Sequence, residues 1–274
     1  MDCSLWRLHQ YGWNQKSSSG GKILQAHPNF QLQYVEPTAG EKPGSGNGIK
    51  MLINDEISIA LSSRPLKDAE IERAKIRGFS LEAVPIAIDG IALYVNPQVA
   101  ISGLTLAQLK DIYTGKITNW NQVGGSNLEI KAFSRDPNDG GTPEYFKEHI
   151  LAGENFASSV AQSYVRDQTD SIQKTSATPG AIAYGTAAEV CNQSTVRSLP
   201  LINNQNQPIS PCDGQQADLT AFTNSTYPIT RQLFVIIKRN GRDAEAAGVA
   251  YAEMFLSQEG QQLVQEAGLV PIRR

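Results

Sequence analysis

Histidine and cysteine are scarce in this chain, which has three of each among its 274 residues. His9, His27 and His149 lie far apart, and none belongs to a His-x-x-His or His-x-x-x-His pair. The spacing therefore predicts no metal site of that kind. A Gly-x-Ser-x-Gly nucleophile motif is also absent. Because no set of acid, base and nucleophile converges in the sequence, the pattern does not favour an enzyme.

The sequence also has no large excess of positive or negative charge and no long apolar run. The chain has 24 Lys and Arg against 27 Asp and Glu, a net charge of −3, which argues against a nucleic-acid-binding protein. No apolar stretch reaches the roughly 18 residues that a membrane-spanning helix needs. Met1, Asp2, Cys3 and Ser4 begin no apolar signal segment. The chain is then either cytoplasmic, or its export signal has been removed or is missing from this sequence.

Two of the cysteines leave an alternative open. Cys191 and Cys212 flank a loop rich in Asn, Gln and Pro. They close this loop as a disulfide if the compartment is oxidising, and they are unrelated thiols otherwise. Cys3 has no partner in either case.

Segments with the patterns of strands and helices alternate along the chain. The length allows one large domain or two of medium size. The alternation predicts an α/β protein with mixed, mostly parallel sheets flanked by helices. The predicted strands are 30–35, 57–61, 81–86, 91–95, 128–133, 181–184 and 233–237. The predicted helices are 49–54, 68–77, 106–113 with Thr105 as its N-cap, 143–151, 170–175, 244–255 and 258–267.

The most informative stretch of the sequence is the loop 134–142, Ser-Arg-Asp-Pro-Asn-Asp-Gly-Gly-Thr. It joins a predicted strand to a predicted helix, with Thr142 as the expected N-cap and Pro143 as the first helical residue. Free backbone N–H groups at a helix start favour an anion. Arg135 adds a guanidinium fork that fits tetrahedral oxygens. The alternative is an ordinary strand-to-helix turn with a solvated arginine.

Two further loops repeat this pattern. Residues 43–48, Pro-Gly-Ser-Gly-Asn-Gly, precede a predicted helix, but their glycine spacing fits neither a dinucleotide-binding loop nor a P-loop. Residues 62–66, Ser-Ser-Arg-Pro-Leu, follow an apolar strand directly. The alternative for this loop is a capped turn that feeds the helix at 68. Loops at the carboxyl ends of strands converge on a crevice in open α/β sheets, so the three loops together predict an oxyanion site.

These residues resemble the substrate-binding protein of the bacterial phosphate ABC transporter, especially its cyanobacterial form. The likeness extends from about residue 28 to the end of the chain. The segments that carry it are 44–52, 62–67, 84–92, 103–105, 112–120, 134–142, 179–184 and 227–231.

The resemblance implies a two-lobed periplasmic-binding-protein fold of type II, with two sheets joined by two hinge strands. Lobe 1 would comprise residues 1–90 together with 228–274, and lobe 2 residues 91–227. The implied function is to bind inorganic phosphate in the cleft between the lobes and to deliver it to the membrane subunits of an ABC permease. The protein would be an extracytoplasmic monomer without cofactor, metal, catalytic activity or nucleic-acid partner.

The resemblance also implies which residues contact the anion: Ser45, Gly46, Ser63, Arg135, Gly140, Gly141 and Thr142, with Arg64, Asp139 and Ser18 as weaker candidates. Arg135 would supply charge, and the other residues neutral hydrogen bonds. Many members of the family have an Asp where Ser63 stands. The family's first strand and loop have no clear counterpart ahead of residue 28, where Ser18 lies in the candidate stretch 17–21. Three alternatives therefore remain: a phosphate sensor, a binding-impaired domain of the same fold, or a binder of sulfate or molybdate.

Overall fold

The structure is a computed structural model of the chain that describes residues 33, 35, 37 and 44–272. The candidate Ser18 and most of the predicted strand 30–35 lie outside these residues, and so does the side chain of Asp139. The chain divides into two compact units, Met1–Ile88 with Gln232–Arg274 and Asp89–Arg231. Among the described residues, no helix combines the length and apolar character needed to cross a bilayer.

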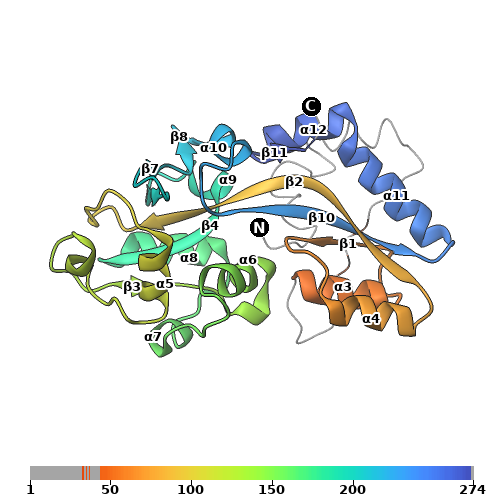
Figure 1. Cartoon of the computed structure of the whole chain (residues 1–274), viewed down its shortest axis with the longest axis horizontal. Helices are drawn as coiled ribbons and strands as arrows, with labels where there is room; N and C mark the ends of the chain where they lie inside the picture. Colours follow the sequence, from red (N-terminus) through yellow and green to blue (C-terminus); the bar gives the residue numbers. More distant parts are fainter. Residues whose placement is uncertain (1–32, 34, 36, 38–43, 273–274) are drawn as a thin grey trace. The chain divides into compact units, whose positions relative to one another are not determined.

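The first unit contains a sheet with helices on both faces (Figure 1). Strand β1 pairs antiparallel with β10, with Ile59 opposite Ile237 and Ser62 opposite Phe234. Strand β11 pairs antiparallel with β2 through Ile88. The elements are α3 (Ser45–Ile53), β1 (Ile59–Ser62), α4 (Asp68–Ile76), β2 (Ser80–Val95), β10 (Thr230–Arg239), α11 (Asp243–Leu256), α12 (Gln258–Glu266) and β11 (Val270–Pro271), of which β2 and β10 continue into the second unit.

Alternation along β1 explains why helices cover both faces. Ile59 and Leu61 are buried in one apolar cluster with Tyr251 of α11. Ala60, between them, is buried in a second cluster with Ile49 of α3. Successive side chains of a strand point to opposite faces, so both faces of β1 are apolar and both need a helix. α3 and the turn that follows β1 are thereby held against the same strand.

The second unit is built around the other end of β2. Ile91–Val95 pair antiparallel with β4, and the same end of β2 pairs antiparallel with β5. Strand β3 adds to β4 in parallel. The elements are α5 (Leu106–Tyr113), η2 (Trp120–Val123), β3 (Lys131–Ala132), η3 (Pro137–Asp139), α6 (Gly141–Tyr145), η4 (Phe146–Ile150), α7 (Ser158–Ala161), α8 (Gln168–Ala177), β4 (Ala181–Thr186), α9 (Ala187–Val190), β5 (Arg197–Leu199), β6 (Leu201–Ile202), β7 (Pro208–Ile209), β8 (Cys212–Asp213), β9 (Gln216–Ala217) and α10 (Leu219–Thr223).

The α/β class with mixed sheets is confirmed, but the expected emphasis on parallel pairing needs correction. Among the described pairs of these two sheets, β3 with β4 is parallel, whereas β1–β10, β11–β2, β2–β4 and β2–β5 are antiparallel. The segments 81–86 and 91–95, expected as separate strands, form the single strand β2. A continuous strand has no crossover helix, and such a crossover is what makes neighbours parallel.

Position 90 of β2 has no room for a side chain, and the sequence has a glycine there. A Cβ atom there would lie 2.2 Å from the Phe222 ring. Phe222 is itself buried and packs edge-on against Tyr227 at 5.4 Å between ring centroids. The glycine is therefore required by close packing inside the second unit.

The structure decides the alternative left open for the cysteines. Cys191 and Cys212 form a disulfide, with Cα atoms 5.5 Å apart and a sequence separation of 21. A loop of this size in the unfolded chain loses enough conformational freedom that the bond contributes about 3 kcal/mol to stability.

We therefore expect the double variant Cys191→Ser/Cys212→Ser to lose about 3 kcal/mol of unfolding free energy. Urea denaturation of the oxidised protein, the reduced protein and the double variant measures this. The reduced wild type is the matched control and should unfold together with the variant. Equal midpoints for the oxidised and reduced protein would contradict the expectation.

Candidate functional site

In the first unit the structure brings two predicted residues together. Ser45 is the first residue of α3 and Ser63 follows β1, and both are buried. The Ser45 Oγ accepts a hydrogen bond from the Ser63 N–H at 3.2 Å and lies 3.4 Å from the Ser63 Oγ. α3 begins four residues earlier than residue 49, where the predicted helix starts, so Ser45 and Gly46 lie in its first turn. Backbone N–H groups in a first turn have no carbonyl partner within their helix. The hydroxyls of Ser45 and Ser63 therefore lie together at the N-terminal end of α3.

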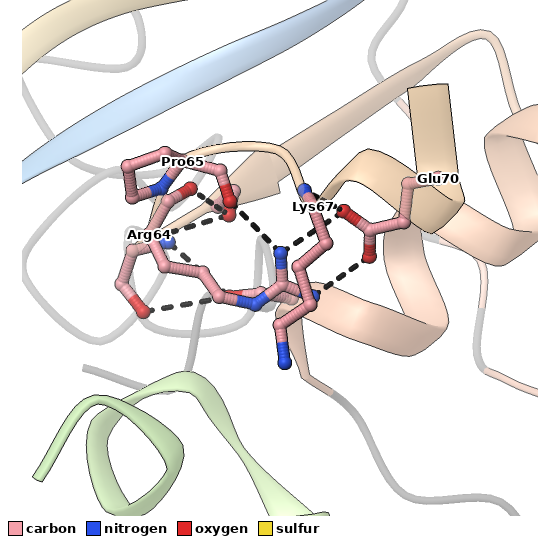
Figure 2. A network of polar contacts seen from close by, with 7 residues as sticks. Arg64, Pro65, Lys67 and Glu70 are labelled. Atoms are coloured by element: carbon pink, nitrogen blue, oxygen red, sulfur yellow. Dashed lines mark hydrogen bonds and ion pairs between the residues drawn. The ribbon is translucent and has the colours of Figure 1, made fainter. Parts of the chain in front are cut away.

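Arg64 is occupied by a carboxylate of its own unit (Figure 2). Its Nη1 and Nη2 donate to the two oxygens of Glu70 at 3.0 and 2.8 Å, and Nη1 also donates to the Pro65 carbonyl at 2.9 Å. Glu70 in turn accepts the N–H of Lys67 at 2.9 Å. The Arg64 side chain is 3% exposed. These contacts fix the turn after β1 against α4.

The Arg64 side chain also lies next to the first turn of α3. A Cβ atom at Gly46 would lie 3.6 Å from Arg64 Nη2. The guanidinium therefore stands beside the backbone of a predicted anion-binding residue, while its two terminal nitrogens donate to Glu70.

In the second unit the predicted loop 134–142 leads into a helix, but the helix begins earlier than expected. Gly140 is the N-cap of α6, and Thr142 is the second helical residue. The prediction that Thr142 is the N-cap and Pro143 the first helical residue is wrong. The Thr142 Oγ1 accepts a hydrogen bond from Arg231 Nη2 at 2.9 Å, so this hydroxyl does not close the helix start. Pro143 is tolerated because first-turn N–H groups bond no carbonyl in their helix. α6 runs directly into η4, so the helical stretch continues to Ile150.

The strand side of the loop is anchored by Ser134. Its Oγ donates to the Arg135 carbonyl at 2.7 Å, so the Tyr184 hydroxyl, 2.6 Å away, donates to Ser134. Burial raises the pKa of the Tyr184 hydroxyl above its ordinary value, and the Arg135 guanidinium lowers it only in part. Tyr184 therefore stays a neutral donor. Arg135, half-buried, follows this anchored position directly.

One network in the second unit was not predicted from the sequence. Arg231 Nε and Nη2 donate to the Asp89 Oδ2 at 3.0 and 2.9 Å, and Thr186 Oγ1 donates to the Asp89 Oδ1. The side chains of Asp89 and Arg231 are each 1% exposed. Through Thr142, the network reaches the predicted anion loop. A signal was present in the sequence, since Asp89 and Arg231 each stand next to an apolar run of a strand and carry opposite charges, and buried charges are paired.

Metal-ligating side chains are not grouped in the described part of the chain, where no set of three or more His, Cys, Asp and Glu residues could hold an ion. The candidate sites are composed of hydroxyls, backbone N–H groups of helix starts, and arginine. Such donor sets suit anions.

Comparison with known proteins agrees with this chemistry. The family model for the PBP superfamily domain matches residues 21–259. The chain therefore belongs to the PBP superfamily.

Within this superfamily the chain is similar to proteins named for phosphate. It is 29% identical to Protein SphX of Synechococcus elongatus, over 84% of this chain and 67% of that protein. It is 26% identical to the phosphate-binding protein PstS of Bacillus subtilis, over 92% of this chain and 74% of that protein. The resemblance drawn from the sequence is confirmed.

A solved structure extends the likeness to the fold. A putative phosphate ABC transporter substrate-binding protein from Clostridium perfringens, with bound phosphate, has a TM-score of 0.70 and 26% identity. The match covers 93% of this chain and 96% of that protein. PstS from Borrelia burgdorferi matches with a TM-score of 0.58 and 25% identity, over 95% and 96% of the two chains.

Proposed function

We propose that this chain binds inorganic phosphate and delivers it to an ABC permease for phosphate uptake. The observation that carries the proposal is the meeting of Ser45 and Ser63 at the first turn of α3. These residues are 18 positions apart, and they join hydroxyl groups to the positive end of a helix dipole. The names of the similar proteins, and the phosphate bound in the Clostridium perfringens structure, identify which oxyanion to test first.

The proposed ligand set comes from three loops. The first unit contributes Ser45, Gly46 and Ser63, and the second contributes Arg135 with the turn at 140–142. Arg135 supplies formal charge, and the other residues supply neutral hydrogen bonds. Each hydrogen bond to a charged partner is worth about 1.5–3 kcal/mol net. We propose that each of these loops contributes to phosphate binding, so that losing any one of them lowers the affinity.

The cellular setting follows from the same proposal. The disulfide between Cys191 and Cys212 supports an oxidising compartment outside the cytoplasm. There the protein would act as a monomeric carrier that changes no covalent bond and passes phosphate to the membrane subunits. Its net charge of −3 suits a protein without a nucleic-acid partner.

We expect isothermal titration of the full chain with inorganic phosphate to give saturable heat and one phosphate ion per chain. Sulfate and molybdate are titrated in parallel, because Ser63 provides no carboxylate to repel fully ionised anions. Saturation by sulfate or molybdate alone would indicate another oxyanion. Absence of heat and of any thermal shift with phosphate would contradict the proposal and indicate a binding-impaired domain.

Phosphate uptake by cells lacking the gene separates transport from sensing, since a sensor leaves uptake capacity intact.

A further inference from the structure

Arg231 is a buried cation beside Thr142, a predicted anion-binding residue. It is the last residue of the second unit, and its side chain is 1% exposed. The Tyr145 ring centroid lies 6.0 Å from its Cζ, at the limit of a cation–π contact. Thr142, to which Arg231 donates, stands in the first turn of α6.

One terminal nitrogen of this guanidinium, Nη1, has no acceptor among the described residues. An arginine side chain has five N–H donors in a rigid plane. Nε and Nη2 engage Asp89, and Nη2 also engages Thr142, which accounts for three of them. Nη1 is buried and has no hydrogen-bond partner among the described residues. Leaving a buried donor of a charged group unsatisfied costs more free energy than leaving a neutral donor unsatisfied.

The geometry also constrains the Thr142 hydroxyl. Because its oxygen accepts from Arg231 Nη2, its O–H cannot point at the guanidinium. Nη1 is bonded to the same carbon as Nη2, so its two N–H groups lie within a few ångströms of that hydroxyl. A tetrahedral oxyanion has several oxygens at a spacing that lets one accept from Nη1 and another from Thr142.

We propose that Arg231 is a further residue of the phosphate site, which orients Thr142 and donates Nη1 to the bound anion. This inference rests on the proposed function. Asp89 neutralises the charge of Arg231 and holds its plane, and Thr186 holds Asp89. Arg231 therefore adds directional N–H donors and little net charge, whereas Arg135 supplies the net charge.

Two variants test the proposal without leaving a charge buried alone. Arg231→Lys keeps a cation opposite Asp89 but loses the planar fork. The double variant Asp89→Asn/Arg231→Gln removes both charges. We expect each to weaken inorganic phosphate binding at least tenfold in isothermal titration, under conditions where thermal melting shows the protein folded.

Arg197→Met is the matched control. Arg197 belongs to the same unit and donates to the Val99 carbonyl at 2.6 Å, so its loss disturbs the unit away from the loop. We expect its melting temperature to fall and its phosphate affinity to stay within twofold of the wild type. A tenfold loss of affinity in this control would overturn the proposal, because any disturbance of the unit would then weaken binding.

A double-mutant cycle separates positioning from general stability. If Arg231 acts partly through Thr142, the combined loss for Thr142→Val and Arg231→Lys falls below the product of the two single losses, by at least threefold. Independent, multiplicative losses would overturn the positioning role. If the wild type binds phosphate and both Arg231 variants bind within twofold of it, the inference alone fails. If the wild type shows no phosphate binding, both the proposed function and this inference are wrong.

Discussion

Replacing Arg135 by alanine is expected to weaken phosphate binding at least tenfold. Arg135 is the charged member of the loop 134–142, and its backbone carbonyl is held by Ser134. The side chain is half-buried, where a charge-assisted hydrogen bond to an oxyanion is worth more than in open solvent. A tenfold loss corresponds to about 1.4 kcal/mol, which is just below the range of about 1.5–3 kcal/mol for one such bond. Isothermal titration with phosphate measures it.

Two further variants show whether the loss comes from geometry or from charge. Arg135→Lys keeps the charge and loses the fork, and we expect an affinity between those of the wild type and the alanine variant. Arg166→Ala removes an arginine of the same unit that is 81% exposed, and we expect the affinity to stay within twofold. An Arg135→Ala protein that binds phosphate as tightly as the wild type would show that this loop does not bind the anion.

Replacing Asp89 by leucine is expected to cost about 3–5 kcal/mol of unfolding free energy, because the Arg231 guanidinium then stays buried without its counter-charge. Asp89 and Arg231 are the first and last residues of the second unit, so their ion pair joins the two ends of that unit. Urea denaturation with linear extrapolation measures the change.

The double variant Asp89→Leu/Arg231→Met is the companion experiment. Removing both charges together removes the uncompensated one, so we expect it to recover most of the lost stability. Asp111→Ala serves as the control, since Asp111 pairs with Lys116 at the surface, where such pairs contribute about 0–1 kcal/mol. An Asp89→Leu protein within 1 kcal/mol of the wild type would contradict the expected cost of burial.

Arg135 and Arg231 of the second unit illustrate two ways of placing a cation near an anion. Arg135 follows an anchored loop position and is half-buried. Arg231 forms an ion pair with Asp89. The variants above separate its effect on the free energy of unfolding from its effect on phosphate affinity. Measuring both arginines by stability and by affinity therefore distinguishes a scaffold residue from a ligand residue.

The elements of this fold were largely predictable, because they depend on local patterns. The helix after Thr105 begins where predicted, with the Thr105 Oγ1 accepting from the Gln108 N–H at 3.2 Å. The C-terminal helices α11 and α12 match their predicted ranges within one residue at each end. Capping side chains and apolar periodicity act over a few residues, so they can be read without tertiary structure.

The sequence by itself determined the α/β class, the family resemblance, and the loops rich in Gly, Ser and Arg that suit an oxyanion. Only the tertiary structure decided which side chains meet: Ser45 with Ser63, Cys191 with Cys212, and Arg231 with both Asp89 and Thr142. It also moved the start of α6 to Gly141, because the Thr142 hydroxyl is engaged by Arg231 from a strand that lies 89 positions further along the chain. Contacts between distant segments depend on strand pairing and on the burial of charge, and local sequence patterns do not specify either one.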